Sequence, residues 1–398
     1  MADNKDKKVL NVPALRFPEF TEGWATKSIS DLATVIGGGT PDTTVKSYWN
    51  GDIQWFTPSE IGKNKYVDLS LRTITEEGLN NSNAKLLPPH TILLSSRATV
   101  GECSIALQEC ATNQGFQSLI AKNCDMDFLY YLIQTKKKEL IRKACGSTFL
   151  EISANEIRKI HTYVPSINEQ KKIGVLLSLI DKRIATQNKI IEDLRLLRDA
   201  IMVEHYRKCN KSELYIYDIG EPFNVMNLSK DDLTKDGSPC IIYGELFTTY
   251  GCVIENVVSH TTKSPNSTLS TKGDLLFPAS TTVDALSLIA PSSINEDGII
   301  LGGDMFGIHV NEQYNSNYLS YYFNIIGKKN LAKYAKGSTI IHLHYADIQK
   351  VKITLPNKNE QETVANLLLK VEHKLNIEQK MLINYLNTKN FLLRQMFI

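Results

Sequence analysis

The sequence predicts an α+β protein with two globular α/β domains joined by two long α-helices and an internal pseudo-two-fold repeat. The chain has 398 residues, which is too long for one compact core. A heptad pattern of apolar residues occurs twice, and each copy follows a stretch of short β-rich runs. The predicted parts are a first globular domain (1–165), a first long helix (166–208), a second globular domain (209–357) and a C-terminal helix (358–398).

The two halves of the chain repeat each other. Residues 168–201 align without a gap with residues 359–392, at an offset of 191 residues. The similarity extends upstream, where 137–170 and 328–361 share a lysine pair, a Gly-Ser-Thr and an Asn-Glu-Gln. A repeat of this length is far too long for a solenoid. It indicates a tandem duplication in which each copy contributes one globular domain and one long helix.

Each long helix has a start signal and a coiled-coil pattern. Pro165 and Pro356 end the preceding segments, and Asn168 and Asn359 are predicted N-caps. Seam positions then alternate by +4 and +3 over about four heptads, which favours two helices packed on each other as a coiled coil over two helices that each lie on their own domain. An internal two-fold would make this pair antiparallel. A helix of ~36–38 residues would be ~55 Å long. The seam is predicted at Ile173, Leu177, Ile180, Ile184, Gln187, Ile191, Leu194, Arg198 and Ile201, and at Val364, Leu368, Val371, Leu375, Glu378, Leu382, Tyr385, Lys389 and Leu392.

Two layers of this seam are polar in both copies. Gln187 corresponds to Glu378, and Arg198 corresponds to Lys389. Polar seam residues lower stability and fix the register of a coiled coil. We hypothesise that Gln187 and Glu378 face each other near the midpoint of the antiparallel pair.

In each globular domain a helix with a basic face is predicted after the β-rich runs, over 128–144 and 318–335. A Gly-Ser-Thr follows each helix, and hydroxyls and backbone N–H groups beside lysines suit phosphate contact. The alternative is a solvated helix face that ends in a glycine C-cap. The candidate phosphate contacts are Lys137, Lys138, Arg142, Ser147, Thr148, Lys328, Lys329, Lys333, Ser338 and Thr339.

Composition and missing motifs exclude several classes of protein. Residues 10–165 hold 16 basic and 16 acidic side chains, and 209–357 hold 11 and 15, so no global basic field exists. The seven scattered cysteines have no C-x-x-C spacing and indicate neither a disulfide framework nor a zinc site. No apolar run approaches a bilayer span, and the start of the chain has no signal-peptide core, so a cytoplasmic protein is expected. No nucleotide-binding loop, methyltransferase motif or catalytic triad is present, and no catalytic or metal-binding residue is predicted.

The order of the short motifs carries a resemblance across nearly the whole chain. "VPALRFPEF", "ISDLATVIGGGTP", "LLSSRATVG", "TNQGFQSL" and "GSTFLEIS" precede the first long helix, and "GSTIIHLH" and "LPNKNEQ" precede the second. In this the chain resembles the specificity subunit of type I restriction–modification systems. The resemblance implies two target recognition domains that bind a bipartite, non-palindromic site in double-stranded DNA. It also implies a coiled coil that docks two DNA methyltransferase subunits and, through them, restriction/translocase subunits.

The same resemblance implies that the chain itself is not an enzyme and holds no cofactor. S-adenosylmethionine, with ATP and Mg for restriction, is expected on the partner subunits. Alternatives that stay open are the specificity subunit of a related methyltransferase–nuclease system, an undetected enzyme, and a coiled-coil scaffold that does not contact DNA. The candidate base contacts, which could equally be exposed turn residues, are Lys63, Asn64, Lys65 and Arg97 in the first domain and Lys263, Ser280, Thr281 and Thr282 in the second.

Overall fold

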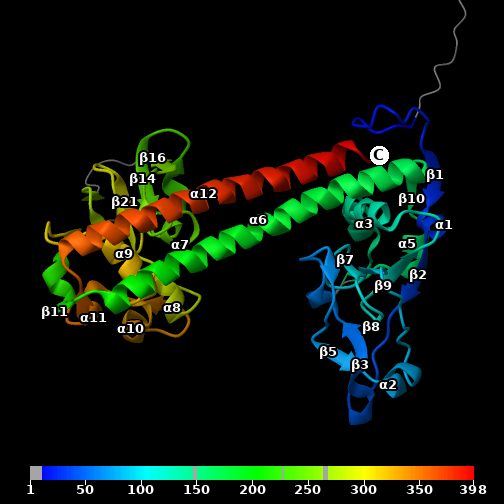
Figure 1. Ribbon diagram of the computed structural model, residues 1–398, viewed down its shortest axis with the longest axis horizontal. Helices are drawn as coiled ribbons and strands as arrows, with labels where there is room; N and C mark the ends of the chain where they lie inside the picture. Colours follow the sequence, from blue (N-terminus) through cyan, green and yellow to red (C-terminus); the bar gives the residue numbers. More distant parts are fainter. Residues whose placement is uncertain (1–10, 147–149, 226–227, 263–267) are drawn as a thin grey trace, which may run out of the picture. The chain divides into compact units, whose positions relative to one another are not determined.

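The chain separates into two compact units, each built from segments far apart in the sequence. The computed structural model describes residues 11–146, 150–225, 228–262 and 268–398. Unit 1 is Met1–Gln187 with Met381–Ile398, and unit 2 is Asn188–Lys380. Each unit therefore contains one globular domain, called domain 1 or domain 2, and a part of both long helices (Figure 1).

Domain 1 is built on a central five-stranded sheet, counted over the described residues. Its order is β2 (Ala33–Gly37), β9 (Gln117–Ala121), β6 (Ile92–Leu94), β7 (Cys103–Ala106) and β4 (Tyr66–Val67). Neighbours are antiparallel except β4 and β7, which are parallel. A second sheet has the order β5 (Arg72–Ile74), β3 (Trp49–Phe56) and β8 (Cys110–Thr112), and a two-stranded sheet pairs β1 (Ala25–Ser28) with β10 (His161–Val164).

Most helices of domain 1 pack with the central sheet and the ends of the long helices in one core. The helices are α1 (Ile29–Leu32), α2 (Glu76–Asn80), α3 (Met126–Thr135), α4 (Lys137–Lys143) and α5 (Ala154–Arg158), with 3-10 turns at Lys46–Tyr48 and Pro58–Glu60. Leu79 of α2 packs against the second sheet instead. Phe128 of α3 stacks on Phe397 from the end of the chain, with ring centroids 5.2 Å apart, and Trp24 packs edge-on against both rings. The C-terminal segment is therefore part of the core of domain 1.

Domain 2 has its own sheets and core. Its central sheet has the order β12 (Gly220–Asn224), β22 (Met305–Val310), β18 (Asp274–Pro278), β20 (Ser292–Ile294) and β15 (Val253–Ile254). A second sheet has the order β13 (Leu233–Thr234), β16 (Ser259–Thr261), β14 (Ser238–Ile242), β21 (Ile300–Gly302) and β17 (Thr268–Leu269), while β11 (Ser212–Tyr215) pairs with β24 (Lys352–Leu355) and β19 (Ser280–Thr281) with β23 (Ile341–His342). Its helices are α7 (Glu245–Thr248), α8 (Ala285–Leu288), α9 (Ser316–Ile325), α10 (Lys328–Leu331) and α11 (Tyr345–Ile348), with 3-10 turns at Ile216–Ile219, Lys230–Asp232 and Ala332–Tyr334.

The sheet topologies of the two domains match, which shows the predicted duplication. Strands β12, β22, β18, β20 and β15 follow the same order as β2, β9, β6, β7 and β4, with one parallel pair at the same edge. A further parallel pair, β14 with β21, corresponds to β3 with β8. Domain 2 differs mainly by additional strands in its second sheet.

The two long helices confirm the predicted coiled-coil seam. Helix α6 spans Ile167–Lys208 and helix α12 spans Lys358–Gln395. The predicted seam residues are buried or half-buried along both helices, whereas most residues between them are exposed. The predicted N-caps are wrong, because α6 already begins one residue before Asn168. In α12 the cap is Asn357, whose side chain accepts a hydrogen bond of 3.0 Å from the backbone N–H of Glu360.

Two equivalent ion pairs join α6 to α12 in antiparallel directions. In unit 1, Lys389 of α12 lies 2.7 Å from Asp181 of α6. In unit 2, Arg198 of α6 lies 3.3 Å from Glu372 of α12. The 191-residue offset turns one pair into the other, so the polar positions Arg198 and Lys389 each bind an acid of the opposite helix. Gln187 and Glu378 are also buried, but they belong to different units, and their contact stays a prediction.

A buried glutamine at the start of each long helix explains the repeated Asn-Glu-Gln. Gln170 accepts a hydrogen bond from the backbone N–H of Asp125, just before α3, and donates to the carbonyl of Pro165. Gln361 does the same with Asn315, just before α9, and with Pro356. All four distances are 2.8–2.9 Å. Each glutamine therefore fixes a domain helix to a long helix through backbone groups that would otherwise be buried without partners.

Candidate nucleic-acid interface

The predicted basic helices are each divided, and a pair of backbone hydrogen bonds follows each of them. The break falls at Lys136 between α3 and α4, and at Gly327 between α9 and α10. After the second part, backbone hydrogen bonds of 2.9 Å in both directions join Cys145 to Glu151. In domain 2, bonds of 2.9 and 2.7 Å join Lys336 to His342. We call Cys145–Glu151 and Lys336–His342 the anchored loops.

The glycine of each anchored loop is required by the backbone. Gly146 and Gly337 have φ values of +133° and +122°, which side chains disfavour. A Cβ on Gly337 would also lie 2.0 Å from the carbonyl oxygen of Ile340. Neither glycine directly follows its helix, because α4 is capped at Ala144 and the last 3-10 turn at Ala335. The alternative of a glycine C-cap is therefore wrong, and the glycine serves the loop.

Both anchored loops are held on the same framework. In domain 1, Ser96 accepts a hydrogen bond of 2.9 Å from the N–H of Ile152 and donates one of 2.8 Å to the carbonyl of Gly115. In domain 2, the carbonyl of Ala279 accepts a hydrogen bond of 2.9 Å from the N–H of Leu343, and the N–H of Ala279 donates one of 2.8 Å to the carbonyl of Asp304. These bonds make Ser96 equivalent to Ala279. The next residues, Arg97 and Ser280, are therefore equivalent as well. The same bonds also make Glu151 equivalent to His342.

The candidate base contacts of domain 1 lie in different environments. Arg97 binds Glu151 through its Nε at 3.0 Å and a terminal nitrogen at 2.5 Å, and the two side chains are 41% and 39% exposed. Lys63 and Asn64 are exposed. The structure therefore leaves these three side chains on the surface of the domain.

Lys65 is the exception and corrects the prediction of a base contact. Its side chain is only 7% exposed, and its Nζ lies 2.6 Å from Asp127 Oδ1. It also donates to Ser178 of α6 at 2.6 Å and to the hydroxyl of Tyr131 at 3.2 Å. Tyr131 in turn donates to Asp181 at 2.6 Å, and burial raises the pKa of its hydroxyl. Lys65 therefore connects domain 1 to α6, and its ammonium group already has three protein partners.

The candidate contacts of domain 2 are only partly at the surface. Ser280 is 7% exposed, Thr281 is half-buried and Thr282 is exposed. Beside them, His342 Nδ1 lies 3.9 Å from the carboxylate of Asp304, with side chains 44% and 46% exposed. Lys263, Ser147 and Thr148 lie outside the described residues.

The basic helices keep several cations at the surface. Lys138, Arg142, Lys329 and Lys333 are exposed, as are Ser338 and Thr339, and Lys328 is half-buried. Lys137 forms an ion pair with Glu102, so a phosphate would have to compete with that carboxylate. In the second anchored loop, Lys336 bonds Asp347 at 2.5 Å and lowers the pKa of that carboxyl.

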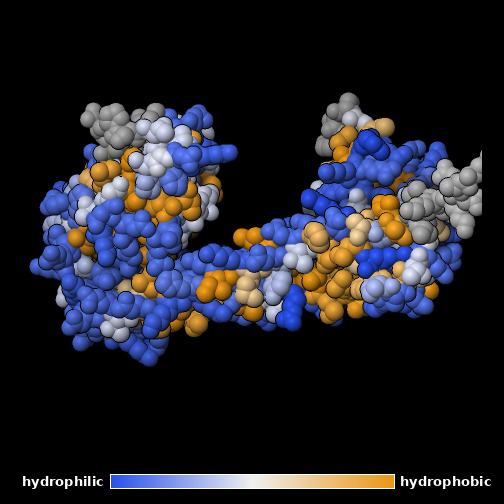
Figure 2. Space-filling view, turned by 90° about the horizontal axis from the view of Figure 1, so that it is seen from above, coloured by the Kyte–Doolittle hydropathy of each residue, from blue (hydrophilic) through white to orange (hydrophobic). Residues whose placement is uncertain are grey.

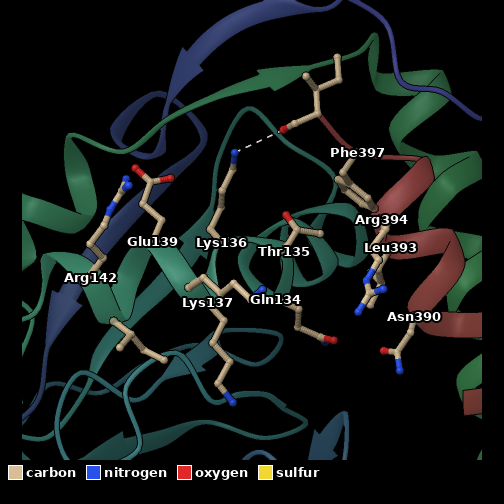
Figure 3. A pocket seen from close by; sticks show the side chains of 13 residues that line it. Gln134, Thr135, Lys136, Lys137, Glu139, Arg142, Asn390, Leu393, Arg394 and Phe397 are labelled. Atoms are coloured by element: carbon tan, nitrogen blue, oxygen red, sulfur yellow. Dashed lines mark hydrogen bonds between the residues drawn. The ribbon is translucent and has the colours of Figure 1, made fainter. Parts of the chain in front are cut away.

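A groove separates α3 and α4 from the C-terminal end of α12 within unit 1. Its volume is about 920 Å³, and Arg394 and Asn390 line the side opposite Lys138 and Arg142. Figure 3 shows Lys136 pointing toward the last residue, whose backbone oxygen lies 3.4 Å from its Nζ, while Lys137 points the other way. Five of its thirteen lining residues are cationic, and Ile141, Leu393 and Phe397 form an apolar part.

Sequence reasoning missed three polar residues of this surface. Glu151, Asp304 and His342 lie beside the candidate contacts. The alignment of Glu151 with His342 at the 191-residue offset was a signal for these two residues, whereas no signal in the sequence pointed to Asp304. Within the part of the chain that the structure describes, no three His, Cys, Asp or Glu residues are placed to hold a metal ion. In the same residues, no helix combines the length and apolar character needed to cross a bilayer.

Comparison with known proteins places this duplicated α+β chain in a family. The family model described as "Type I restriction modification DNA specificity domain" matches it twice, at residues 21–196 and 216–387. The chain therefore belongs to this family of type I restriction–modification specificity proteins.

Curated relatives include specificity subunits of type I restriction enzymes. The MjaIX subunit of Methanocaldococcus jannaschii is 39% identical over 181 residues, which are 44% of this chain and 42% of the relative. The EcoR124I/EcoR124II subunit of Escherichia coli is 30% identical over 202 residues, 48% of each protein. The chain thus spans about half the length of these two relatives. The MjaVIII subunit of M. jannaschii is 22% identical over 94% of this chain and 92% of its own length.

A solved structure shares the fold over the whole chain. The S subunit of a type I system from M. genitalium superposes with a TM-score of 0.62 at 16% identity, covering 97% of this chain and 99% of that one. A likeness at this level of identity concerns the fold. It agrees with the duplicated arrangement of one globular domain and one long helix per half.

Proposed function

We propose that this chain is the DNA-specificity subunit of a type I restriction–modification complex and binds a bipartite, non-palindromic site through its two domains. The observation that carries the proposal is the pair of anchored loops. The backbone frame is the same in both domains, but the side chains on it differ, with Arg97 and Glu151 in one and Ser280 and His342 in the other. Equivalent frames with different surfaces suit two half-sites of different sequence.

The basic helices beside the anchored loops would hold the DNA backbone. Lys138, Arg142, Lys329, Lys333 and the exposed hydroxyls of Ser338 and Thr339 are available for phosphate oxygens. Because the total charge is only +2, binding by the isolated chain should be weak and salt-dependent. Partner subunits would supply the rest of the DNA affinity.

The outer faces of the long helices would dock two methyltransferase subunits and, through them, restriction/translocase subunits. Large apolar side chains are exposed there in both units, and Figure 2 shows hydrophobic patches on the helical surface. Scattered exposed apolar residues are normal, but a row of them on a paired helix suits a partner helix. These residues include Val175, Leu179, Ile383 and Phe391 in unit 1 and Leu196, Leu197, Leu367 and Ile377 in unit 2. Catalysis, with S-adenosylmethionine, ATP and Mg, would belong to the partners, and the complex would act in the cytoplasm.

The test is to express the chain with a type I methyltransferase subunit and sequence the methylated bases of the host DNA. We expect methylation at one bipartite, asymmetric motif that disappears when this chain is omitted. A motif that persists without the chain would contradict the proposal. A chain that binds the methyltransferase without changing where it methylates would instead be a scaffold.

A further inference from the structure

We infer that the positions equivalent through the anchored loops determine base specificity, and that the two domains use opposite hydrogen-bonding chemistry there. Domain 1 would read a guanine with Arg97. Domain 2 would read an exocyclic amino group, of cytosine or adenine, with Asp304. This inference rests on the proposed function and assigns to it the class of base pair that each domain recognises.

The frame that carries these side chains is held by the same backbone hydrogen bonds in both domains. Arg97 and Ser280 directly follow Ser96 and Ala279, whose backbone groups make the same two hydrogen bonds in each domain. Ser96 is fully buried and Ala279 is 4% exposed, so the polar side chains stand at the edge of a packed core. Side chains on rigid elements can be placed more precisely on a base edge than side chains on free loops.

In domain 1 the frame presents a hydrogen-bond donor. The guanidinium of Arg97 has two nitrogens directed at one oxygen of Glu151, at 3.0 and 2.5 Å. A guanidinium held in this way offers a planar fork, and the O6 and N7 atoms of guanine accept such a fork in the major groove. Since both side chains are about 40% exposed, water competes for this pair, and the pair is weak enough to exchange for a base. Glu151 would orient the arginine before DNA binds.

In domain 2 the same frame presents a hydrogen-bond acceptor. The carbonyl of Asp304 accepts the hydrogen bond that the carbonyl of Gly115 accepts in domain 1. Domain 1 has a glycine at this position and therefore no carboxylate there. A carboxylate beside DNA is repelled by the phosphates, and a hydrogen bond accepted from a base edge would offset that repulsion. The amino groups at N4 of cytosine and N6 of adenine are the donors that base edges offer in the major groove. His342 Nδ1 lies 3.9 Å from the carboxylate of Asp304, whose side chain is still 46% exposed. The carboxylate can therefore reach a base.

The experiment compares methylation motifs for Arg97→Lys, Asp304→Ser and the unchanged chain, each with the methyltransferase. Arg97→Lys keeps the charge but loses the planar fork. We expect it to lose discrimination for G at one position, by ~10-fold or more, only in the half-site that domain 1 reads. Asp304→Ser should relax one position in the other half-site. In each variant the unaffected half-site is an internal control. Arg158→Lys on α5, where the arginine donates to Asn155 and to the carbonyl of Val35, is a matched arginine control that should leave the motif unchanged.

The outcomes separate this inference from the proposed function. Thermal unfolding first establishes that each variant folds. An unchanged motif with uniformly weaker methylation in Arg97→Lys would show a phosphate contact and overturn the inference, while the bipartite motif of the unchanged chain would keep the proposed function. Relaxation in both half-sites by a single variant would also overturn it. If the unchanged chain directs no motif at all, the proposed function fails and this inference fails with it.

Discussion

Replacing Lys65 with Met should lower stability strongly without changing the DNA motif. The ammonium group has a half-buried partner in Asp127 and two hydroxyl acceptors, Ser178 and Tyr131, and the lysine side chain is 7% exposed. Breaking a buried ion pair by removing one partner costs ~3–5 kcal/mol, and exposed pairs contribute ~0–1 kcal/mol. Asp127 is 28% exposed, so water recovers part of its solvation. We therefore expect a loss of about 2–3 kcal/mol, since Met still fills the space of the lysine stem.

The assay is thermal unfolding of the full chain, together with its methylation motif. For a unit of about 200 residues, 1 kcal/mol shifts Tm by ~2–4 °C, so the midpoint of unit 1 should fall by roughly 5–10 °C. Lys63→Met, an exposed neighbour, is the matched control and should stay within ~0.5 kcal/mol of the unchanged chain. A double-mutant cycle with Asp127→Asn should show a coupling energy above ~0.5 kcal/mol. A Lys65→Met chain with unchanged Tm and an altered motif would refute the reasoning and restore Lys65 as a base contact.

Four further outcomes test the helices, the buried amides and the pseudo-two-fold. Replacing both Gln187 and Glu378 with Leu should raise Tm, because polar seam residues lower stability, and an unchanged or lower midpoint would count against this. A fragment ending at Lys208 should dimerise and, with the methyltransferase, methylate a symmetric site, whereas a monomer with no palindromic motif would contradict the two-fold. Gln361→Ala should cost about 2–4 kcal/mol, measured by urea unfolding, since it leaves the Asn315 N–H and the Pro356 carbonyl without their amide partner. Burial lowers the pKa of His205, so the unfolded state binds a proton at a higher pH than the folded state does. The free energy of unfolding should therefore fall as the pH drops below the ordinary histidine pKa of ~6.5. His205→Phe should remove this part of the pH profile.

The long helices and the duplication could be predicted from the sequence because both are repetitive signals. A seam that returns every three or four residues over about four heptads leaves few other ways to bury its apolar side chains. The same periodicity marked Arg198 and Lys389 as polar layers. Arg198 pairs with Glu372 and Lys389 pairs with Asp181, each on the opposite helix. Only an antiparallel register brings these partners close. Pattern alone does not identify such partners.

The individual surface residues were less predictable, because exposure depends on long-range packing. Lys63 and Lys65 are two positions apart in the same turn-rich stretch, yet one is exposed and the other is held by α3 and α6. The sequence distance between Lys65 and Ser178 is 113 residues, and no local pattern connects them. Asp304 was missed for the same reason. It lies in the turn before β22, and the fold brings this turn next to His342 of the anchored loop.

The residues that hold the frame repeat at the offset of 191, while the residues on its surface differ. Gln170 and Gln361, the glycines of the anchored loops, and the Asp181–Lys389 and Glu372–Arg198 pairs are bonded or conformationally constrained in both halves. Changing any of them leaves buried or strained groups and costs stability. Arg97, Glu151 and His342 stand on that frame at the surface, and substitutions of exposed side chains typically change stability by less than ~0.5 kcal/mol. A duplicated chain of this kind can therefore diverge in what each domain reads without losing the fold that presents it.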